Sequence, residues 1–288
     1  RLAGDASQLH VRAGGVHGES PFVRARAARN RILDCHGARV RVRRAVDTAT
    51  PLHGLALVAA DRAPDLVSDT DPALPGHVTA YALPVRRFVV IGQRARASPD
   101  FLLVDIPSTS GRLDVLLRCL RAALLVSHGV RRDTVVYLSL LGNPERPRTL
   151  RFDGPAAKYM RPDERSLATV IKKALAIELG RAGEFVPVRE GIAIADGSVA
   201  CVWRELAGAA LFLLEEGAPD LRECSIPSGD VAFVIGDHLG LTAELREDLI
   251  ARGAQTVSVG PVSLHAEDVV TLVANELDRR EASNAAPP

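Results

Sequence analysis

The stretch from Val231 to Leu241 constrains the fold of this 288-residue chain more than any other segment. Its first five residues, Val-Ala-Phe-Val-Ile, form an unbroken apolar run, which indicates a strand buried on both faces, as in parallel sheets. Gly236 ends the run, and Asp237 and His238 follow at once. Open α/β proteins bind ligands at the carboxyl ends of parallel strands. This loop is therefore a candidate binding site, although many glycine turns at such positions are only turns.

Short apolar runs of the same kind alternate with segments of helical spacing through the rest of the chain. Strands are expected at 88–92, 134–141, 150–154, 209–214, 231–235 and 256–259. Helices are expected to begin after the hydroxyls of Ser108, Thr109 and Ser110, at Pro162, at Thr242 and at Ser263. The mixed stretch 180–203 predicts no more than a helical turn or two. This alternation predicts an α/β fold with a mainly parallel sheet flanked by helices.

The composition excludes several classes of protein. An apolar content of 47% and a charged content of 25% are ordinary for a globular protein of one or two domains. No apolar run reaches the roughly 18–20 residues that cross a bilayer, and the start lacks a signal-peptide pattern, so a cytoplasmic protein is expected. The formal net charge is +1, so any contact with nucleic acid must come from a local basic patch. The four cysteines form no CxxC pair, so we expect no metal site and no disulfide framework.

Residues 1–84 differ in composition from the rest of the chain. They contain eleven arginines and no lysine, and they show no convincing series of periodic elements. We therefore expect an N-terminal extension that is disordered or not native, such as the product of an over-extended gene model that begins before an initiator at Val85. A basic arm for RNA at 39–44 is the functional alternative. A folded domain is expected at 85–281, followed by a frayed tail at 282–288.

Three strand-end loops lie in the last third of the chain, at 213–217, 235–238 and 257–265. Backbone amides and carbonyls of such loops can bind the edge of an adenine while apolar side chains sandwich its ring. No GxGxxG, GxxxxGK[ST] or GxSxG motif is present, so dinucleotide, nucleoside-triphosphate and α/β-hydrolase sites lose their usual support. These loops predict a small-molecule pocket.

Seven short motifs follow one another in the same region: Gly-Arg-Leu-Asp at 111–114, Val-Ser-His at 126–128, Arg-Arg-Asp at 131–133, Pro-Asp-Glu-Arg at 162–165, Ile-Lys-Lys-Ala-Leu at 171–175, Ile-Gly-Asp-His at 235–238 and Leu-His-Ala at 264–266. In kind and order they resemble the archaeal tRNA pseudouridine-54 N1-methyltransferases, the TrmY family of the SPOUT superfamily. The resemblance covers residues 88–279 and does not reach residues 1–84.

This resemblance implies a SPOUT domain whose C-terminal loops form a deep trefoil knot around S-adenosylmethionine, an exception to the rule against knotted connections. The cofactor contacts then fall on Leu213, Gly236, Val259, Gly260, Pro261, Val262, Ser263, Leu264 and Val269. Related sequences tend to have Asn-His-Cys where this chain has Glu267-Asp268-Val269, a departure that preserves an apolar contact at 269. A side chain at Gly236 is expected to collide with the cofactor and to leave the fold intact. The family also implies a homodimer that pairs through the knot region.

The implied reaction is methylation of N1 of pseudouridine at position 54, in the T-loop of tRNA. The alternatives are the related ribosomal-RNA pseudouridine N1-methyltransferase activity and a SPOUT-fold RNA-binding dimer without turnover. Because N1 carries a proton, a positioned base should help, and Asp114 and Asp237 are the candidates for that base or for orienting it. Arg112 is a third catalytic candidate. Asp114 could instead interact with a helix dipole, and Asp237 could satisfy loop amides.

Basic residues on the expected helices and loops are candidates for phosphate contacts with RNA. They are Arg131, Arg132, Arg165, Lys172 and Lys173. For any one of them a solvated helix face is the competing interpretation. His128, His238 and His265 lack metal-ligand spacing and are expected to be structural or to line the pocket.

Overall fold

The computed structural model describes residues 32–35, 38–41, 85–142 and 146–285. The chain divides into two compact units, Arg1–Asp69 and Thr70–Pro288. In the first unit, β1 (Ile32–Cys35) pairs antiparallel with β2 (Ala38–Arg41) as a hairpin. The remainder of the expected extension at 1–84 lies outside the described residues, as do positions 42–44 of the candidate basic arm.

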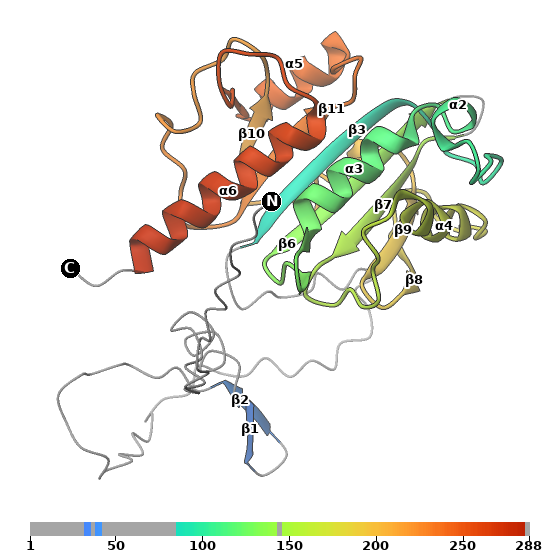
Figure 1. The fold of residues 1–288 in the computed structure, drawn as a ribbon, viewed down its shortest axis with the longest axis horizontal. Coiled ribbons are helices and arrows are strands. Elements are labelled where there is room, and N and C mark those ends of the chain that lie inside the picture. Colours follow the sequence, from blue (N-terminus) through green and yellow to red (C-terminus); the bar gives the residue numbers. More distant parts are fainter. Residues whose placement is uncertain (1–31, 36–37, 42–84, 143–145, 286–288) are drawn as a thin grey trace, which may run out of the picture. The chain divides into compact units, whose positions relative to one another are not determined.

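The second unit is built on an eight-stranded sheet whose spatial order is β12-β10-β11-β3-β6-β7-β9-β8 (Figure 1). The first five strands run parallel to one another, and the last three are antiparallel. The parallel strands are β3 (Arg86–Arg96), β6 (Thr134–Gly142), β10 (Ala210–Leu214), β11 (Val231–Gly236) and β12 (Gln255–Val257). The expected α/β fold with a mainly parallel sheet is confirmed.

Continuous apolar runs form the centre of this sheet because both of its faces are covered. In β11, Val231 to Ile235 are all buried, and β11 pairs with β3 from Val231 opposite Arg86 to Gly236 opposite Ile91. The rings of Phe88, Phe233 and Phe212 stack across three neighbouring strands, with centroids 5.9 and 5.0 Å apart. Such offset aromatic pairs add to the free energy gained by burial alone.

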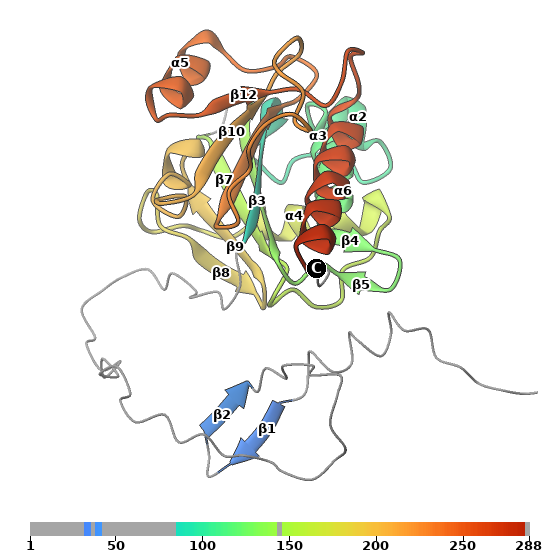
Figure 2. The same cartoon turned by 90° about the vertical axis from the view of Figure 1, so that its left-hand side faces the viewer.

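Helices cover the two faces of the sheet. One face packs against α3 (Leu113–Leu124), α4 (Glu164–Leu175) and α6 (Ala266–Ala285), which lie together in Figure 2. The other face packs against α5 (Ala243–Ala251) and the 3-10 turn η1 (Val199–Cys201). Alternate residues of β3 separate accordingly, since Phe88 and Val90 face the first layer and Val89 and Ile91 face the second.

Several elements differ from the sequence-based expectation. The stretch 180–203 contains two strands, β8 (Val186–Arg189) and β9 (Ile192–Asp196), which extend the sheet beyond β7 (Arg148–Asp153). A second hairpin, β4 (Leu125–Val126) with β5 (Gly129–Val130), follows α3. These strands have only two to five residues each, and runs so short are difficult to assign from sequence.

Helix starts also differ in part. Thr242 caps α5 and Asp163 caps α4, each by accepting a backbone N–H three residues on. Ser108 and Thr109 lie inside a short helix that sequence did not predict, α2 (Ile106–Thr109), whereas the Ser110 hydroxyl accepts the backbone N–H of Leu113 at the start of α3, at 3.1 Å. Ser263 does not cap the last helix, because α6 begins only at Ala266 and the Ser263 hydroxyl bonds Glu216. This last helix continues to Ala285, past the expected boundary at 281.

Candidate active site at the carboxyl ends of three parallel strands

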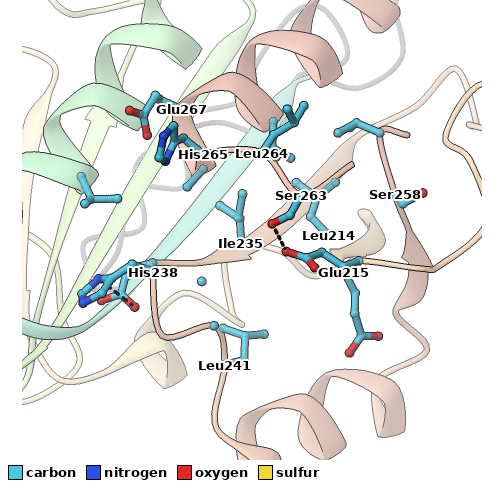
Figure 3. A pocket seen from close by; sticks show the side chains of 18 of the residues that line it. Leu214, Glu215, Ile235, His238, Leu241, Ser258, Ser263, Leu264, His265 and Glu267 are labelled. Atoms are coloured by element: carbon cyan, nitrogen blue, oxygen red, sulfur yellow. Dashed lines mark hydrogen bonds and ion pairs between the residues drawn. The ribbon is translucent and has the colours of Figure 1, made fainter. Parts of the chain in front are cut away.

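A cavity of about 840 Å³ lies where β10, β11 and β12 end. It is walled by the three loops that follow these strands and by the start of α3 (Figure 3). The apolar part of the lining includes Leu214, Ile235, Leu241, Val259 and Leu264, and the polar part includes Glu215, Glu216, Asp237, Ser258 and Ser263. Mostly apolar walls with a few directed polar groups are typical of a small-molecule site.

Asp237 fixes the loop that follows β11. Its carboxylate accepts the backbone N–H of Gln93 at 2.9 Å and that of Leu239 at 2.9 Å. The side chain is fully buried, and the backbone N–H of Asp237 itself donates to the carbonyl of Ile91, within β3. Both oxygens are thus used to hold backbone, which favours the interpretation that Asp237 satisfies loop amides.

Gly236 is required by this same loop. The chain turns back at Gly240, which has a φ of +70°, and a Cβ on Gly236 would lie 2.4 Å from the carbonyl carbon of Gly240. Real Cβ atoms essentially never approach backbone so closely. The expectation that a side chain at Gly236 would leave the fold largely intact is therefore wrong, whereas its collision with the cofactor stays a prediction. The first collision is with the protein's own backbone.

The opposite wall of the cavity carries Arg112 at an unusual backbone position. Gly111 and Arg112 have φ of +67° and +69°, and a Cβ on Gly111 would lie 1.8 Å from the carbonyl oxygen of Arg94. The close approach of this loop to the end of β3 therefore requires glycine at 111. Arg112 is a non-glycine residue held in the left-handed region, a strain that is concentrated at functional sites.

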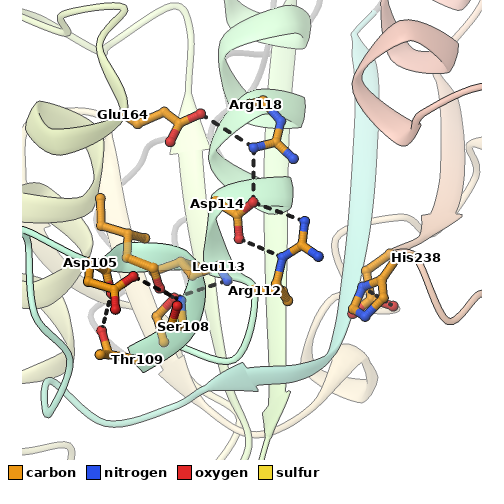
Figure 4. A network of polar contacts seen from close by, with 12 residues as sticks. Asp105, Ser108, Thr109, Arg112, Leu113, Asp114, Arg118, Glu164 and His238 are labelled. Atoms are coloured by element: carbon orange, nitrogen blue, oxygen red, sulfur yellow. Dashed lines mark hydrogen bonds and ion pairs between the residues drawn. The ribbon is translucent and has the colours of Figure 1, made fainter.

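Arg112 is held in place by Asp114 (Figure 4). Its Nε and Nη2 donate to the two carboxylate oxygens at 3.0 and 3.2 Å, and Arg118 donates to the same carboxylate at 2.9 Å. Burial acts to raise the pKa of Asp114, but the hydrogen bonds from Arg112 and Arg118 outweigh it and leave the pKa below its ordinary value. Asp114 is therefore a stable carboxylate that orients two arginines, and it does not itself line the cavity.

Arg118 links three helices beside the cavity. Besides Asp114 it donates to Glu267 at the start of α6, at 2.7 Å, and to Glu164 at the start of α4, at 3.4 Å. Hydrogen bonds to Glu267 and Asp114 raise its pKa although burial acts in the opposite direction. Glu267 thus has a charged partner on a neighbouring helix.

The loop after β12 closes the remaining side. The backbone N–H of Ser258 donates to the carbonyl of Pro219, and its hydroxyl donates to the carbonyl of Ala218, each at 2.8 Å. The loop therefore lies against the segment that follows β10. Ser263 donates to Glu216, while Glu215 pairs with Arg246 of α5 at 2.7 Å. Backbone groups of this loop and both glutamates thus face one space (Figure 3).

The residues predicted to contact a cofactor converge on this cavity. Eight of the nine line it: Leu213, Gly236, Val259, Gly260, Val262, Ser263, Leu264 and Val269. Pro261 is exposed between two of them and is not part of the lining. Arg112 and Asp237 line the cavity too, as do His238 and His265.

The basic residues predicted to bind RNA do not form one cluster. Arg131 lies against α6, where both terminal nitrogens donate to Asp278 at 2.8 Å. Arg132 donates to the carbonyls of Gly154 and Pro155, and Lys172 donates to the carbonyl of Phe101. Arg165 and Lys173 are exposed on α4. Three of the five are therefore bound, at least in part, within the protein.

Five charged residues that line the cavity were not among the predicted site residues: Arg118, Glu215, Glu216, Arg246 and Glu267. Their ion pairs join positions 31 and 149 residues apart, a distance at which no local pattern exists. Glu215 could have been found, because it directly follows a buried strand. Among the described residues no group of three or more His, Cys, Asp or Glu side chains could hold a metal ion.

Residues 85–282 match the model of a protein family described as "Putative SAM-dependent RNA methyltransferase". The chain belongs to this family. The methyltransferase is 41% identical over 204 residues to the tRNA (pseudouridine(54)-N(1))-methyltransferase of Methanosarcina mazei, covering 71% of this chain and 96% of that protein. It is 38% identical over 203 residues to the Pyrococcus abyssi protein of the same name, covering 68% and 98%. The solved structure of Archaeoglobus fulgidus Nep1 bound to S-adenosylhomocysteine aligns over 69% of this chain and 99% of that one, with 17% identity and a TM-score of 0.48.

The cavity of the methyltransferase fits S-adenosylmethionine in polarity and charge. Its lining holds three arginines (Arg112, Arg118 and Arg246) and four carboxylates (Glu215, Glu216, Asp237 and Glu267). The lining therefore carries one more negative than positive charge. This complements S-adenosylmethionine, whose sulfonium, ammonium and carboxylate give it one net positive charge. The apolar walls suit an adenine ring. No described helix is long and apolar enough to cross a membrane.

Proposed function

We propose that this protein transfers a methyl group from S-adenosylmethionine to N1 of pseudouridine at position 54 of tRNA. The proposal rests chiefly on the 41% identity to a tRNA (pseudouridine(54)-N(1))-methyltransferase across 96% of that protein's length. The gathering of eight expected cofactor contacts around one cavity supports it. We assign the methyltransferase domain to residues 85–281, in keeping with the family match at 85–282.

The residues proposed to hold the cofactor come from all three strand-end loops. Leu213, Gly236 and Val269 supply apolar surface and close backbone approach, and the loop from Val259 to Leu264 supplies amides and carbonyls for an adenine edge. Pro261 shapes that loop without facing the cavity. S-adenosylmethionine, when bound, supplies an electrophilic methyl carbon.

Arg112 is the residue that we assign to the reaction itself. It lies on the cavity wall, and its guanidinium is fixed by two hydrogen bonds to Asp114. A uracil ring that loses the N1 proton gains negative charge, and a preorganised cation next to that ring stabilises the charge. Arg112 supplies this cation without having to reorganise.

Asp114 and Asp237 are positioning residues in this proposal. The lowered pKa of Asp114 makes it a weak base, because an efficient base has a pKa near the working pH. Asp237 is fully buried and accepts two backbone amides, so its carboxylate holds the loop that follows β11. Neither aspartate is therefore assigned as the base that takes the N1 proton.

The trefoil knot and the homodimer expected from the family also belong to the proposal. The chain leaves β12 hydrogen-bonded to residues 218–221 and then reaches the opposite face of the sheet as α6, which supports a threaded last segment (Figure 2). Leu239, Val262 and Leu264 are exposed at 46%, 68% and 41% around the cavity, and pairing of two copies there would bury them. Light scattering of the purified protein tests the dimer. We also propose a cytoplasmic location, which a tRNA substrate supports.

Calorimetric titration with S-adenosylmethionine, followed by assay of methyl transfer to tRNA, tests the function. We expect binding with one site per chain and incorporation of one methyl group per tRNA. Binding without transfer to any RNA would favour a SPOUT-fold RNA-binding protein that lacks turnover. Transfer to ribosomal RNA alone would favour the related ribosomal activity.

A further inference from the structure

Tyr159 is presented to solvent in a conformation that costs free energy. Its side chain is 92% exposed, and its φ is +56°, in the left-handed region that non-glycine residues rarely adopt. Among residues 85–142 and 146–285, no other Phe, Tyr or Trp is exposed. An exposed ring on a strained backbone points to a use outside the folding of the protein itself.

The loop that carries Tyr159 is firmly held at its base. The backbone amides of Ala156 and Ala157 donate to the carbonyl of Asp153 at 3.1 and 2.7 Å. Arg132 donates to the carbonyls of Gly154 and Pro155 at 3.0 Å each. Only the tip of the loop projects, so the ring is presented from an ordered support.

A basic hollow of about 470 Å³ lies beside Tyr159, between this loop and the β4–β5 hairpin. Its lining includes Arg132 and Lys158 and no carboxylate. Lys158 pairs with Glu190 at the surface, where both side chains are more than half exposed and the pair contributes little stability. Arg161 and Arg165 are also exposed just beyond Tyr159 along the chain. An anionic ligand with a flat aromatic group matches this combination of charge and ring.

We propose that Tyr159 and this basic hollow form a second RNA-binding site, in which an unpaired base of the substrate stacks on the Tyr159 ring while its phosphates lie against Arg132 and Arg161. The inference rests on the proposed function, since it takes the ligand to be the RNA substrate. Stacking of unpaired bases on aromatic side chains beside cations is how proteins commonly bind single-stranded RNA.

The second RNA-binding site is separate from the methyl-transfer cavity. Arg112 precedes α3, whereas Leu125, which lines the hollow, follows the same helix. The 12 residues of α3 separate the two ends by roughly 18 Å at about 1.5 Å per residue. A contact so far from the reacting nitrogen contributes to RNA binding and leaves the chemical step alone.

The test compares Tyr159→Ala, Tyr159→Phe and Tyr159→Asn with the wild type, at one fixed salt concentration. We expect Tyr159→Ala to raise the KM for tRNA between roughly 5-fold and 150-fold, the effect of losing one stacked base. The kcat and the affinity for S-adenosylmethionine should stay within about 2-fold of wild type. Tyr159→Phe should restore the wild-type KM, because it keeps the ring.

Tyr159→Asn is the matched control for folding. Asn tolerates the left-handed region and lacks a ring, so this variant should be at least as stable to heat as wild type and yet show the raised KM. An unchanged KM for Tyr159→Ala and Tyr159→Asn, on an enzyme that methylates tRNA, would overturn the second RNA-binding site alone. Loss of methylation by the wild type itself would count against the proposed function instead.

Discussion

Gly236 ends β11 at the floor of the cavity, and its replacement by alanine tests how that floor is held. An added Cβ would lie 2.4, 2.5 and 2.7 Å from the carbonyl carbon, carbonyl oxygen and Cα of Gly240. Ordinary van der Waals contact begins at about 3.4 Å, so the loop at 237–240 must move by about 1 Å. The neighbouring atoms are backbone, which cannot rotate aside as a side chain can.

This displacement has two measurable consequences. Overpacking of this kind typically costs about 1–3 kcal/mol, which lowers the Tm of a domain of this size by roughly 2–12 °C. The same loop carries Asp237, whose carboxylate holds Gln93 and Leu239, so the cavity changes shape with it. A shift of about 1 Å in a reaction site can lower the rate by about 100-fold.

Differential scanning calorimetry of Gly236→Ala measures the change in Tm, and titration of S-adenosylmethionine together with steady-state kcat measures the effect of the altered cavity. Gly229→Ala is the matched control, since Gly229 lies two residues before β11 and a Cβ there meets nothing within 4 Å. We expect a lowered Tm and weaker binding for Gly236→Ala and neither for Gly229→Ala. A Gly236→Ala protein with unchanged Tm that has lost cofactor binding would refute the backbone collision and restore collision with the ligand.

Three further variants test the surroundings of the cavity. Asp114→Asn should destabilise the fold by about 1–3 kcal/mol at pH 7, because two arginines lose a buried carboxylate. The folded-state pKa of Asp114 is lowered, so the stability that its carboxylate contributes is present above the ordinary pKa of 3.8 and is lost as the pH falls through the folded-state pKa. Urea unfolding at several pH values measures the difference in the free energy of unfolding between wild type and Asp114→Asn. A difference that fails to shrink in acid would contradict this prediction. Arg112→Gln should lower kcat by about 100-fold with little change in cofactor affinity, measured by steady-state kinetics and calorimetry, and an unchanged kcat would remove Arg112 from the reaction. Thr242→Ala should lower the free energy of unfolding by about 1 kcal/mol, because it removes the cap on α5, and it should leave kcat unchanged. Equal stability of the two proteins to urea would show that the cap contributes nothing.

The centre of the fold could be predicted from sequence because its strands are buried on both faces. Runs such as Val231 to Ile235 carry that burial in their composition, and the glycine or acidic residues after them mark the strand ends. In contrast, β8 is only four residues long and contains Pro187, which counts against a strand in the sequence pattern. Its place at the edge of the sheet depends on pairing with β9, which no local pattern specifies.

The site could be predicted in outline for the same reason. Loops at the ends of parallel strands meet at one edge of the sheet, so residues from 213, 236 and 259–264 share one cavity. What sequence did not give is how the site is held together. The turn of the chain back to Gly240, which makes Gly236 necessary, and the contact of Arg118 with Glu267 depend on tertiary geometry.

Methyl transfer to two synthetic tRNAs, identical except for pseudouridine or uridine at position 54, tests the central claim most directly. In pseudouridine N1 carries a proton and is free to accept a methyl group, whereas in uridine the same nitrogen is bonded to the ribose. The account predicts one methyl group on N1 of the pseudouridine-54 tRNA, located by mass spectrometry of the digested nucleosides, and none on the uridine-54 tRNA. Equal methylation of the two tRNAs, or methylation of neither, would contradict it.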